Sequence, residues 1–376
     1  MRFLALILLL LHVAASHAQP IPVPTLSARA WLLLDYASGQ VLASHDADTR
    51  LEPASLTKVM TTYLVAEALA SKTLTLQQPV TVSERAWRTQ GSRSFVPVNK
   101  GVTVDELLKG MVIQSGNDAS VALAEAIGGS EDAFAAMMNR AAQRIGLKDT
   151  NFLNASGYFE GPAPTHYSTA RDLARLAAAL IRDHPEAHAL HAVKEYTYNG
   201  IRQHNRNRLL WADATVDGLK TGHSNAAGFC LIATAKRGPR RLISVVLGTA
   251  SEDARARDSL NLLNWGFSGF DAVKLYDKGQ AVAQLKIFKG AENVVQAGFA
   301  EDFVVSIPRG TADKLTVQLV SQQPLIAPVA AGAVVGTLKL AVAGQPWGEY
   351  PVVAQSAVPV AGFFGRLWDG LRLYFQ

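Results

Sequence analysis

The sequence predicts a mixed α/β protein, in which an antiparallel sheet flanked by helices is followed by a small all-β domain and a C-terminal amphipathic helix. Strand-like apolar stretches lie near both ends of residues 19–272 and enclose an alanine-rich, mainly helical middle, a pattern typical of a sheet covered by helices. Short Val, Leu and Ile runs separated by Gly, Pro, Gln and Asp fill residues 273–354. Residues 355–376 are rich in aromatic side chains at helical spacing.

Length and charge narrow the class of protein. A chain of 376 residues favours more than one domain, and a hydrophobic content of 49% is ample for a packed core. The formal net charge is only +5 and no basic stripe is present, so nucleic acid is not expected as a partner. The single cysteine, Cys230, lies in an apolar run; we expect a buried, unreactive thiol without an intrachain disulfide.

The first 18 residues predict a secretory signal. Arg2 supplies a positive start, residues 3–11 are an unbroken apolar run, and Ser16-His17-Ala18 is a small-x-small cleavage site. The run is too short for a stable membrane span. We therefore expect the mature chain to begin near Gln19 in the periplasm. The sequence has no cysteine near the cleavage site, so a lipoprotein is not expected.

The elements follow in order along the mature chain. A hairpin is expected from 28–34 and 40–44 around a polar turn. Helices are expected at 53–70, 104–112, 119–127 and, closing the domain, 255–267. The strands expected after the helical middle are 193–198, 218–221, 228–235 and 242–248 in the first domain, then 303–307, 315–320 and 334–342 in the all-β domain. The charges of the turn at 237–241 are expected to be solvated.

Ser55 and Lys58 form the first candidate catalytic pair. Residues three apart lie on one face of a helix, so the helix at 53–70 would place the Lys58 amine beside the Ser55 hydroxyl. A serine hydroxyl is a weak nucleophile at its own pKa and needs such a neighbouring base. The alternative interpretation is an N-terminal capping serine with a solvated lysine one turn later.

Two further motifs decide between these interpretations. Ser115-Gly116-Asn117 separates two predicted helices, and Lys220-Thr221-Gly222 lies in a strand-like setting. Each motif alone is ordinary, and Ser115 with Asn117 could be simple turn chemistry. All three in this order match the active-serine motifs of penicillin-recognising enzymes.

The chain resembles the serine D-alanyl-D-alanine carboxypeptidases, the low-molecular-mass penicillin-binding proteins. The residues around Ser55-Leu-Thr-Lys58, Ser115-Gly-Asn117-Asp-Ala and Asp217-Gly-Leu-Lys220-Thr-Gly-His223 carry the resemblance, together with 166–174 and 204–211. It implies a penicillin-binding catalytic domain at 19–272, a C-terminal β domain at 273–354 and an anchor helix at 355–376. One departure is Ala155, where the family usually has proline after the asparagine.

The resemblance implies a role for each candidate site residue. Lys58 would take the proton of Ser55, which attacks the carbonyl of the penultimate D-alanine, and Ser115 would relay a proton to the departing amine. Asn117 would hold the substrate amide and Lys220 would supply positive potential. The N–H groups of Ser55 and His223 would form an oxyanion hole. Thr221 and Arg255 would bind the terminal carboxylate, and Gly222 would be the substrate-binding residue between Thr221 and His223 on the strand. Arg257 is the alternative to Arg255.

The implied partners are peptidoglycan stem peptides, β-lactams as covalent inhibitors, and a membrane surface. The reaction would remove the terminal D-alanine from pentapeptide stems and contribute to peptidoglycan maturation and cell shape. No cofactor or metal is expected. His184, His188 and His191 have helical spacing but lack an acidic ligand pattern, so a polar helix face is preferred to a zinc site.

The C-terminal segment predicts an in-plane membrane anchor on the inner membrane. A helix over 359–376 gathers its aromatic and aliphatic side chains on one face and directs Arg366, Asp369 and Arg372 away from it. The apolar face comprises Phe363, Phe364, Leu367, Trp368, Leu371, Tyr374 and Phe375. The alternative is a helix docked on its own protein.

Three other functions compete with a carboxypeptidase. A secreted β-lactamase of class A needs an extra glutamate for deacylation, and Glu160 is the only acid between Asn151 and His166. A non-enzymatic envelope protein with a vestigial pocket is disfavoured because all the expected catalytic side chains are present. A transpeptidase or endopeptidase acting on crosslinked wall is the nearest rival.

Overall fold

The computed structural model describes residues 22–158 and 165–374. The predicted signal at 1–18, Glu160, Phe375 and Gln376 lie outside these residues. The chain divides into two compact units. The larger comprises 23–273 with 304–306, and the smaller comprises the described residues of 274–303 and 307–376 with Pro22.

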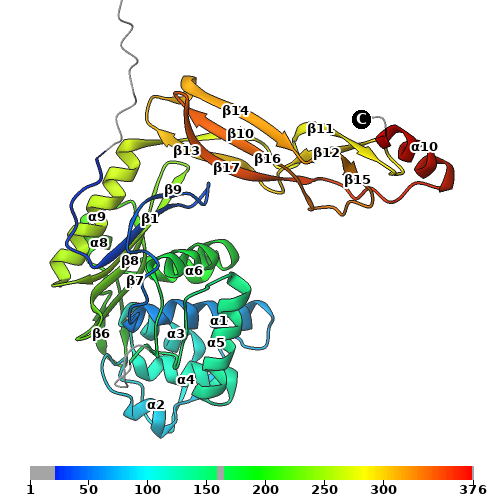
Figure 1. Ribbon diagram of the computed structural model, residues 1–376. Helices are drawn as coiled ribbons and strands as arrows, with labels where there is room; N and C mark the ends of the chain where they lie inside the picture. The colour runs from blue at the N-terminus through cyan, green and yellow to red at the C-terminus, as the bar shows by residue number, and fades with distance from the viewer. Residues whose placement is uncertain (1–21, 159–164, 375–376) are drawn as a thin grey trace, which may run out of the picture. The chain divides into compact units, whose positions relative to one another are not determined.

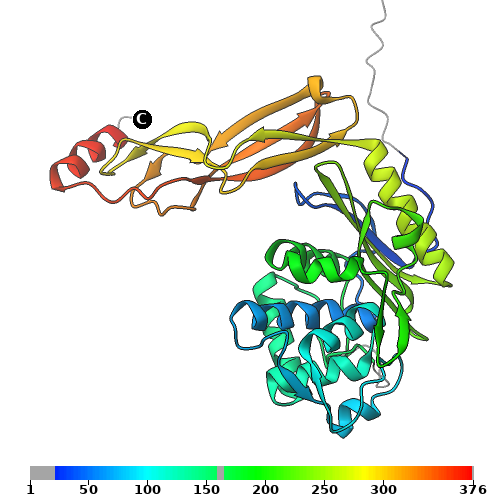
Figure 2. The same ribbon diagram turned by 180° about the vertical axis from the view of Figure 1, so that it is seen from behind.

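A five-stranded antiparallel sheet forms the larger unit's centre, in the order β2-β1-β9-β8-β7. Helix α9 (Glu252–Gly269) covers one face and α6 (Ala170–Asp183) lies on the other (Figures 1 and 2). Every residue of β1 is buried, as expected for an inner strand covered on both faces. The strands are β1 (Ala30–Asp35), β2 (Val41–His45), β7 (Val216–Ser224), β8 (Gly228–Arg237) and β9 (Arg240–Thr249).

A helical layer lies beside this sheet, beyond α6 (Figure 1). Helix α1 (Lys58–Ala70) is its centre, since nearly all of its side chains are buried. Thr103 and Glu106 form a capping box at the start of α3, which fixes where that helix begins. The other elements are η1 (Ala54–Thr57), α2 (Glu84–Arg88), α3 (Val104–Ile113), α4 (Asn117–Gly128), α5 (Glu131–Ile145), α7 (Pro185–Ala189), η2 (Leu190–Ala192) and α8 (Leu209–Ala212), with the two-stranded pairs β3 (Pro79–Thr81) and β4 (Gly101–Thr103), and β5 (Glu195–Tyr198) and β6 (Ile201–His204).

The smaller unit contains a six-stranded sheet in the order β14-β16-β17-β12-β11-β15. Along β16 buried side chains alternate with more exposed ones, as in a sheet with one covered face, whereas the edge strand β14 has no buried residue. The elements of this unit are β11 (Ala281–Phe288), β12 (Val294–Gly298), η3 (Ala312–Lys314), β14 (Leu315–Ser321), β15 (Leu325–Ile326), β16 (Val334–Val342), β17 (Gln345–Ala354) and α10 (Phe363–Tyr374). A further pair, β10 (Phe270–Tyr276) with β13 (Phe303–Pro308), includes residues of both units.

The predicted fold class is confirmed, and the expectations for two turns of the larger unit are wrong. Ser55 does not lie in the α-helix; it lies in the 3₁₀ turn η1, which leads directly into α1 at Lys58. The charges at 237–241 are not all solvated. Arg240 is buried and donates to Asp35 at 2.8 Å, and Arg241 makes a two-pronged contact with Asp217. Both arginines have aspartate partners that are distant in sequence, so no local pattern reveals the pairing.

Candidate active site

The Ser55–Lys58 pair forms as its spacing predicts, although through a 3₁₀ turn. The Lys58 Nζ atom lies 2.9 Å from Ser55 Oγ. A 3₁₀ turn places residues i and i+3 almost directly above one another, so it brings the two groups at least as close as an α-helix would. Ser55 is partly exposed whereas Lys58 is fully buried. The hydroxyl can therefore meet a substrate while the amine stays away from water.

The contacts of Lys58 leave one direction open for the lone pair of a neutral amine. Its Nζ atom also lies 2.7 Å from Asn117 Oδ1 and 2.7 Å from the Ser156 carbonyl oxygen. Carbonyl oxygens only accept hydrogen bonds, so these two partners take the two hydrogens of a neutral amine. The remaining lone pair then points to Ser55 Oγ, where it can accept the hydroxyl proton.

Electrostatics favour the same form. Burial, assisted by the Arg206 guanidinium, lowers the pKa of Lys58 to about 7, and Asp118 opposes this shift. An amine with a pKa close to neutral pH is suited to act as a general base.

The second motif lies where α3 meets α4. Ser115 has a φ of 67°, an unusual conformation for a residue with a side chain. Its buried Oγ atom has no hydrogen-bond partner among the described residues, so it is available to a substrate. Asn117 is the first residue of α4, and its Nδ2 atom donates to the Gln90 carbonyl at 2.5 Å. That contact fixes the amide orientation and leaves Oδ1 facing Lys58.

The third motif lies on β7, the edge strand of the sheet in the part of the chain described. Gly222 lies so close to η1 that a Cβ atom there would meet the Pro53 carbonyl oxygen at 3.0 Å. The strand therefore lies directly against the turn that carries Ser55. Lys220 is buried, and burial together with the cations Lys58, Arg206 and Arg255 lowers its pKa well below its usual value.

A single cleft of about 900 Å³ joins the motifs. Arg255 lines it, is almost fully buried and donates to the Gly222 carbonyl at 3.2 Å. The side chain of Arg257, the alternative, is 60% exposed and lies beside Asp258. The cleft brings together the predicted residues Ser55, Ser115, Asn117, Thr221, Gly222, His223 and Arg255, with Lys58 and Lys220 buried beneath.

Three functional groups escaped the sequence interpretation. Arg206 lines the cleft and lowers the pKa of both lysines; it lies in the segment 204–211, which resembles the family, but its residue type alone does not indicate this role. Asp118 is buried and accepts N–H bonds from Ser94 and Phe95, which ties that loop to α4. The Ser156 contact uses a backbone carbonyl, which no residue type can signal in a sequence.

The histidine triplet is not the polar helix face that the sequence suggested. His188 and His191 are buried, and burial lowers the pKa of His188 to about 4 and that of His191 to about 3. His191 Nδ1 lies 2.9 Å from the Leu219 carbonyl oxygen. No group of three potential metal ligands occurs within residues 22–158 and 165–374. These histidines instead fill the interior beside β7.

Comparison with known families matches the chain over nearly its full length. Residues 14–251 match the family model described as D-alanyl-D-alanine carboxypeptidase, and residues 270–360 match that of the penicillin-binding protein 5 C-terminal domain. The D-alanyl-D-alanine carboxypeptidase DacC of Escherichia coli is 42% identical, over 99% of this chain and 94% of the relative.

Solved structures agree with this match. Penicillin-binding protein 5 from Haemophilus influenzae has a TM-score of 0.84 at 37% identity, covering 90% of this chain and 99% of that one. Penicillin-binding protein D2 from Listeria monocytogenes, in its ampicillin-bound form, has a TM-score of 0.60 at 32% identity, covering 65% and 99%. The cleft, its serine and its buried lysines thus lie in a chain similar to carboxypeptidases and penicillin-binding proteins throughout.

Proposed function

This chain belongs to the D-alanyl-D-alanine carboxypeptidase family, a family of serine hydrolases, and we propose that Ser55 is its nucleophile and Lys58 the base that activates it. The observation that supports this assignment is the three-partner geometry of Lys58, in which two carbonyl oxygens take the amine hydrogens and the third direction faces Ser55 Oγ. The substrate is the D-alanyl-D-alanine end of a peptidoglycan pentapeptide stem.

The proposed reaction is an acyl transfer in two halves. The Ser55 hydroxyl gives its proton to Lys58 Nζ as Oγ bonds to the carbonyl carbon of the penultimate D-alanine. The C–N bond then breaks, and the departing amine takes a proton relayed through Ser115, whose Oγ has no other partner within the described residues. Water hydrolyses the resulting ester and restores Ser55. A β-lactam carbonyl would acylate Ser55 in the same way.

The free edge of β7 would hold the substrate backbone. Strand β8 pairs with one side of β7, and the residues Thr221, Gly222 and His223 of β7 line the cleft, where an extended peptide would pair with the strand. We place the His223 and Ser55 N–H groups around the developing oxyanion, where each such donor contributes about 3 kcal/mol. Asn117 would contact the substrate amide.

Arg255 is proposed to bind the terminal carboxylate together with Thr221, and Lys220 would gain positive charge as that carboxylate arrives. A hydrogen bond to a charged group contributes about 1.5–3 kcal/mol. Arg255→Ala should therefore lower kcat/KM for D-alanine release by about 10- to 100-fold. Arg257→Ala is the matched control and should stay within about twofold, since surface charges contribute little. Equal losses in both variants would contradict the assignment.

Mass spectrometry of the intact protein after penicillin treatment tests the proposal most directly. One penicillin mass should be added, and peptide mapping should place it on Ser55. D-alanine release from a soluble pentapeptide, without crosslinked product, separates a carboxypeptidase from a transpeptidase. Rapid turnover of penicillin with no persistent adduct would instead indicate a β-lactamase.

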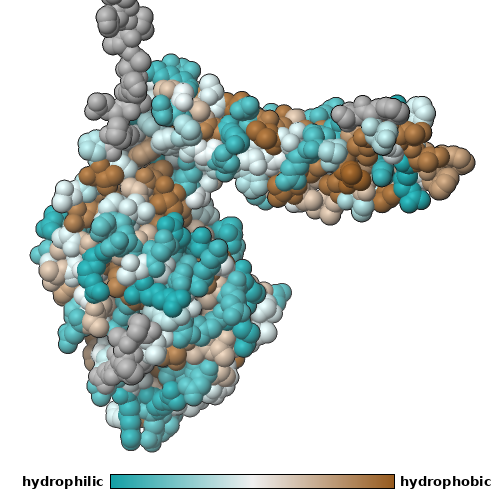
Figure 3. Space-filling model, viewed as in Figure 1, coloured by the Kyte–Doolittle hydropathy of each residue, from teal (hydrophilic) through white to brown (hydrophobic). Residues whose placement is uncertain are grey.

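Helix α10 is proposed to attach the protein to the outer face of the inner membrane, from the periplasm. Asp369 lies on its inward face and accepts the Lys289 N–H bond at 2.7 Å, so this residue is not directed to solvent as the sequence suggested. The apolar side chains face outward instead; Phe364 is 83% and Tyr374 84% exposed. Figure 3 shows apolar residues gathered where α10 ends the smaller unit.

The helix therefore contacts its own unit through one face and presents its apolar face to solvent. No helix in the described residues has the length and hydropathy needed to cross a bilayer. An exposed aromatic face beside Arg366 and Arg372 suits the boundary between acyl chains and anionic headgroups. A place beside the wall would also suit the proposed contribution to peptidoglycan maturation and cell shape.

The double variant Phe364→Asp/Trp368→Asp tests membrane attachment without removing the helix. Charges on the apolar face should move the protein from the membrane fraction to the soluble fraction and abolish sedimentation with anionic vesicles. Penicillin labelling should not change. Arg366→Gln/Arg372→Gln is the control for headgroup attraction and should weaken sedimentation only at low salt. Undiminished sedimentation of the Asp variant would contradict the anchor.

A further inference from the structure

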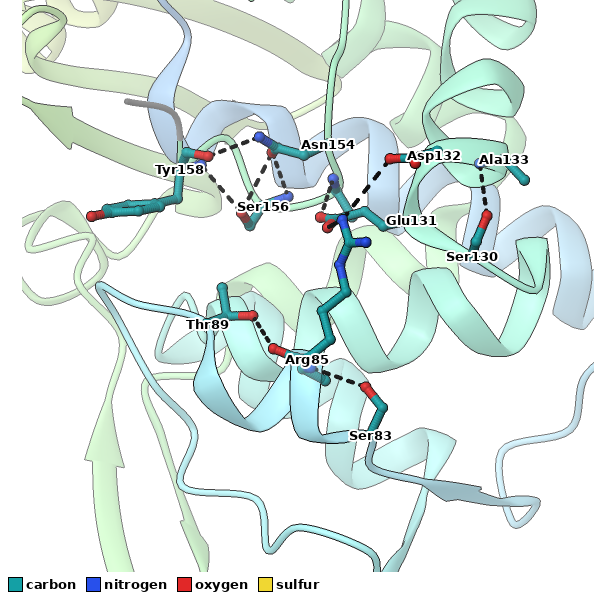
Figure 4. A network of polar contacts seen from close by, with 12 residues as sticks. Ser83, Arg85, Thr89, Ser130, Glu131, Asp132, Ala133, Asn154, Ser156 and Tyr158 are labelled. Atoms are coloured by element: carbon teal, nitrogen blue, oxygen red, sulfur yellow. Dashed lines mark hydrogen bonds and ion pairs between the residues drawn. The ribbon is translucent and has the colours of Figure 1, made fainter. Parts of the chain in front are cut away.

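The Ser156 carbonyl that holds Lys58 lies in a segment with unusually dense polar contacts, residues 154–158 (Figure 4). Asn154 Oδ1 accepts N–H bonds from Ser156 and Gly157, and Asn154 Nδ2 donates to the Tyr158 carbonyl. Gly157 has a φ of 76°, and a Cβ atom there would meet the Ala54 carbonyl oxygen at 1.9 Å. The segment is therefore held against the turn that carries Ser55.

Ala155 is held from both sides. Thr61 Oγ1, on α1, donates to the Ala155 carbonyl at 2.6 Å, and the Ala155 N–H group donates to Glu131 Oε1 at 3.2 Å. A proline at this position would have no N–H to donate. The next carbonyl along the chain, that of Ser156, is the one that accepts from Lys58 at 2.7 Å.

Glu131 joins this segment to the helical layer. It is the first residue of α5, and its second carboxylate oxygen accepts from Arg85 on α2 at 2.9 Å (Figure 4). The Glu131 side chain is only 9% exposed, whereas the neighbouring Asp132 is 88% exposed and lies 3.9 Å from the same arginine. A carboxylate that served only the helix N-terminus would not need to be buried, because Asp132 already supplies that charge.

We propose that Glu131 is a positioning residue for the catalytic lysine: through the Ala155 N–H group it fixes the Ser156 carbonyl, and this carbonyl sets the direction of the Lys58 lone pair. The inference rests on the proposed role of Lys58 as the base. Loss of the contact lets the Ser156 carbonyl move, so one amine hydrogen loses its acceptor and the lone pair is no longer held toward Ser55. Small misplacements of reacting groups slow catalysis strongly.

The test compares two substitutions with opposite properties. Glu131→Asp keeps the charge beside Arg85 but shortens the reach to Ala155, whereas Glu131→Gln keeps the reach and an accepting oxygen but loses the charge. The rate of acylation by a fluorescent penicillin is measured from pH 5 to pH 9. Glu131→Asp should lower the plateau rate by about tenfold, and Glu131→Gln should stay within about threefold of the parent.

The pH profile distinguishes positioning from a general structural effect. Lys58 is faced by Arg206, Lys220 and Asp118, and none of these changes in the variants. An ammonium that loses an acceptor is less stable, so the acid limb of the Glu131→Asp profile should move to lower pH. Asp132→Ala removes the other carboxylate near Arg85 and is the matched control. This variant should keep the pH profile of the parent enzyme.

The possible outcomes distinguish the positioning role of Glu131 from the proposed role of Lys58 as the base. An unchanged profile in a folded Glu131→Asp protein, or a Gln variant slower than the Asp variant, overturns the positioning role and leaves Lys58 as the base. If the acylation rate of the parent enzyme does not fall on the acid side of neutral pH, Lys58 is not the base, and the positioning role of Glu131 is contradicted as well. Thermal unfolding of each variant confirms that the rates compare folded proteins.

Discussion

Ser55→Ala should abolish covalent labelling by fluorescent penicillin and lower D-alanine release by about 10⁴-fold or more. The effect is large because the substitution removes Oγ, the only atom proposed to form a covalent bond with the substrate. The cleft and its hydrogen-bond donors stay in place. Ser55 lies in a 3₁₀ turn, and among the described residues its side chain hydrogen-bonds only with Lys58. The unfolding temperature should therefore change little.

Ser92→Ala provides the control for this experiment. Ser92 also lines the cleft, and its contact with Asn117 uses the backbone carbonyl, which alanine keeps. This variant should be labelled at the parent rate. Labelling that persisted in Ser55→Ala, or an adduct mapped to Ser115 or Ser92, would show that another hydroxyl is the nucleophile.

The grouping of the candidate site residues was more predictable from the sequence than the contacts that surround them. Ser55 and Lys58 are three residues apart, so local geometry alone brings them together in either type of helical turn. Ser115, Asn117 and Lys220 could be joined to that pair only through the resemblance of the three motifs, because nothing in their spacing fixes a distance across the fold. The structure places Ser55, Ser115 and Asn117 on one cleft, with Lys58 and Lys220 buried beneath it.

The contacts that tune the site were not predictable. Arg206 affects Lys58 and Lys220 across the cleft, and the Ser156 carbonyl has no signature in the residue type. Glu131 looks like an ordinary acidic residue in the first turn of a helix. Only its burial and its bond to the Ala155 N–H distinguish it from Asp132.

The strands of the sheets also differ in how well the sequence predicts them. The inner strands β1, β8 and β9 are continuous apolar runs, and all three were located from composition. Strand β17 was missed because Pro346, Gly348 and Pro351 interrupt its pattern, yet it pairs with β16 along most of its length. Pairing with a long neighbour outweighs unfavourable local propensity, and this cannot be known before the neighbour is placed.

Lys58→Met should lower the acylation rate by about 10³-fold or more, since a serine hydroxyl without a base is a poor nucleophile. In the parent enzyme the pKa of Lys58 is lowered to about 7, and only the neutral amine can accept the Ser55 proton. The rate should therefore rise with pH through about 7 and level off above it, falling about tenfold per pH unit on the acid side. The residual rate of Lys58→Met should lack this limb.

The same shift predicts the pH dependence of stability. A buried lysine whose pKa is lowered on folding binds fewer protons in the native state than in the unfolded one, so its cost is fully present below about pH 7 and is relieved as the pH rises toward the unfolded value. Between pH 7 and 9 the parent should gain up to about 1.4 kcal/mol of unfolding free energy per pH unit relative to Lys58→Met. Urea unfolding of both proteins at several pH values measures this difference. Parallel stability curves, with an acid limb that survives in the variant, would mean that Lys58 is charged throughout and that another group accepts the proton of Ser55.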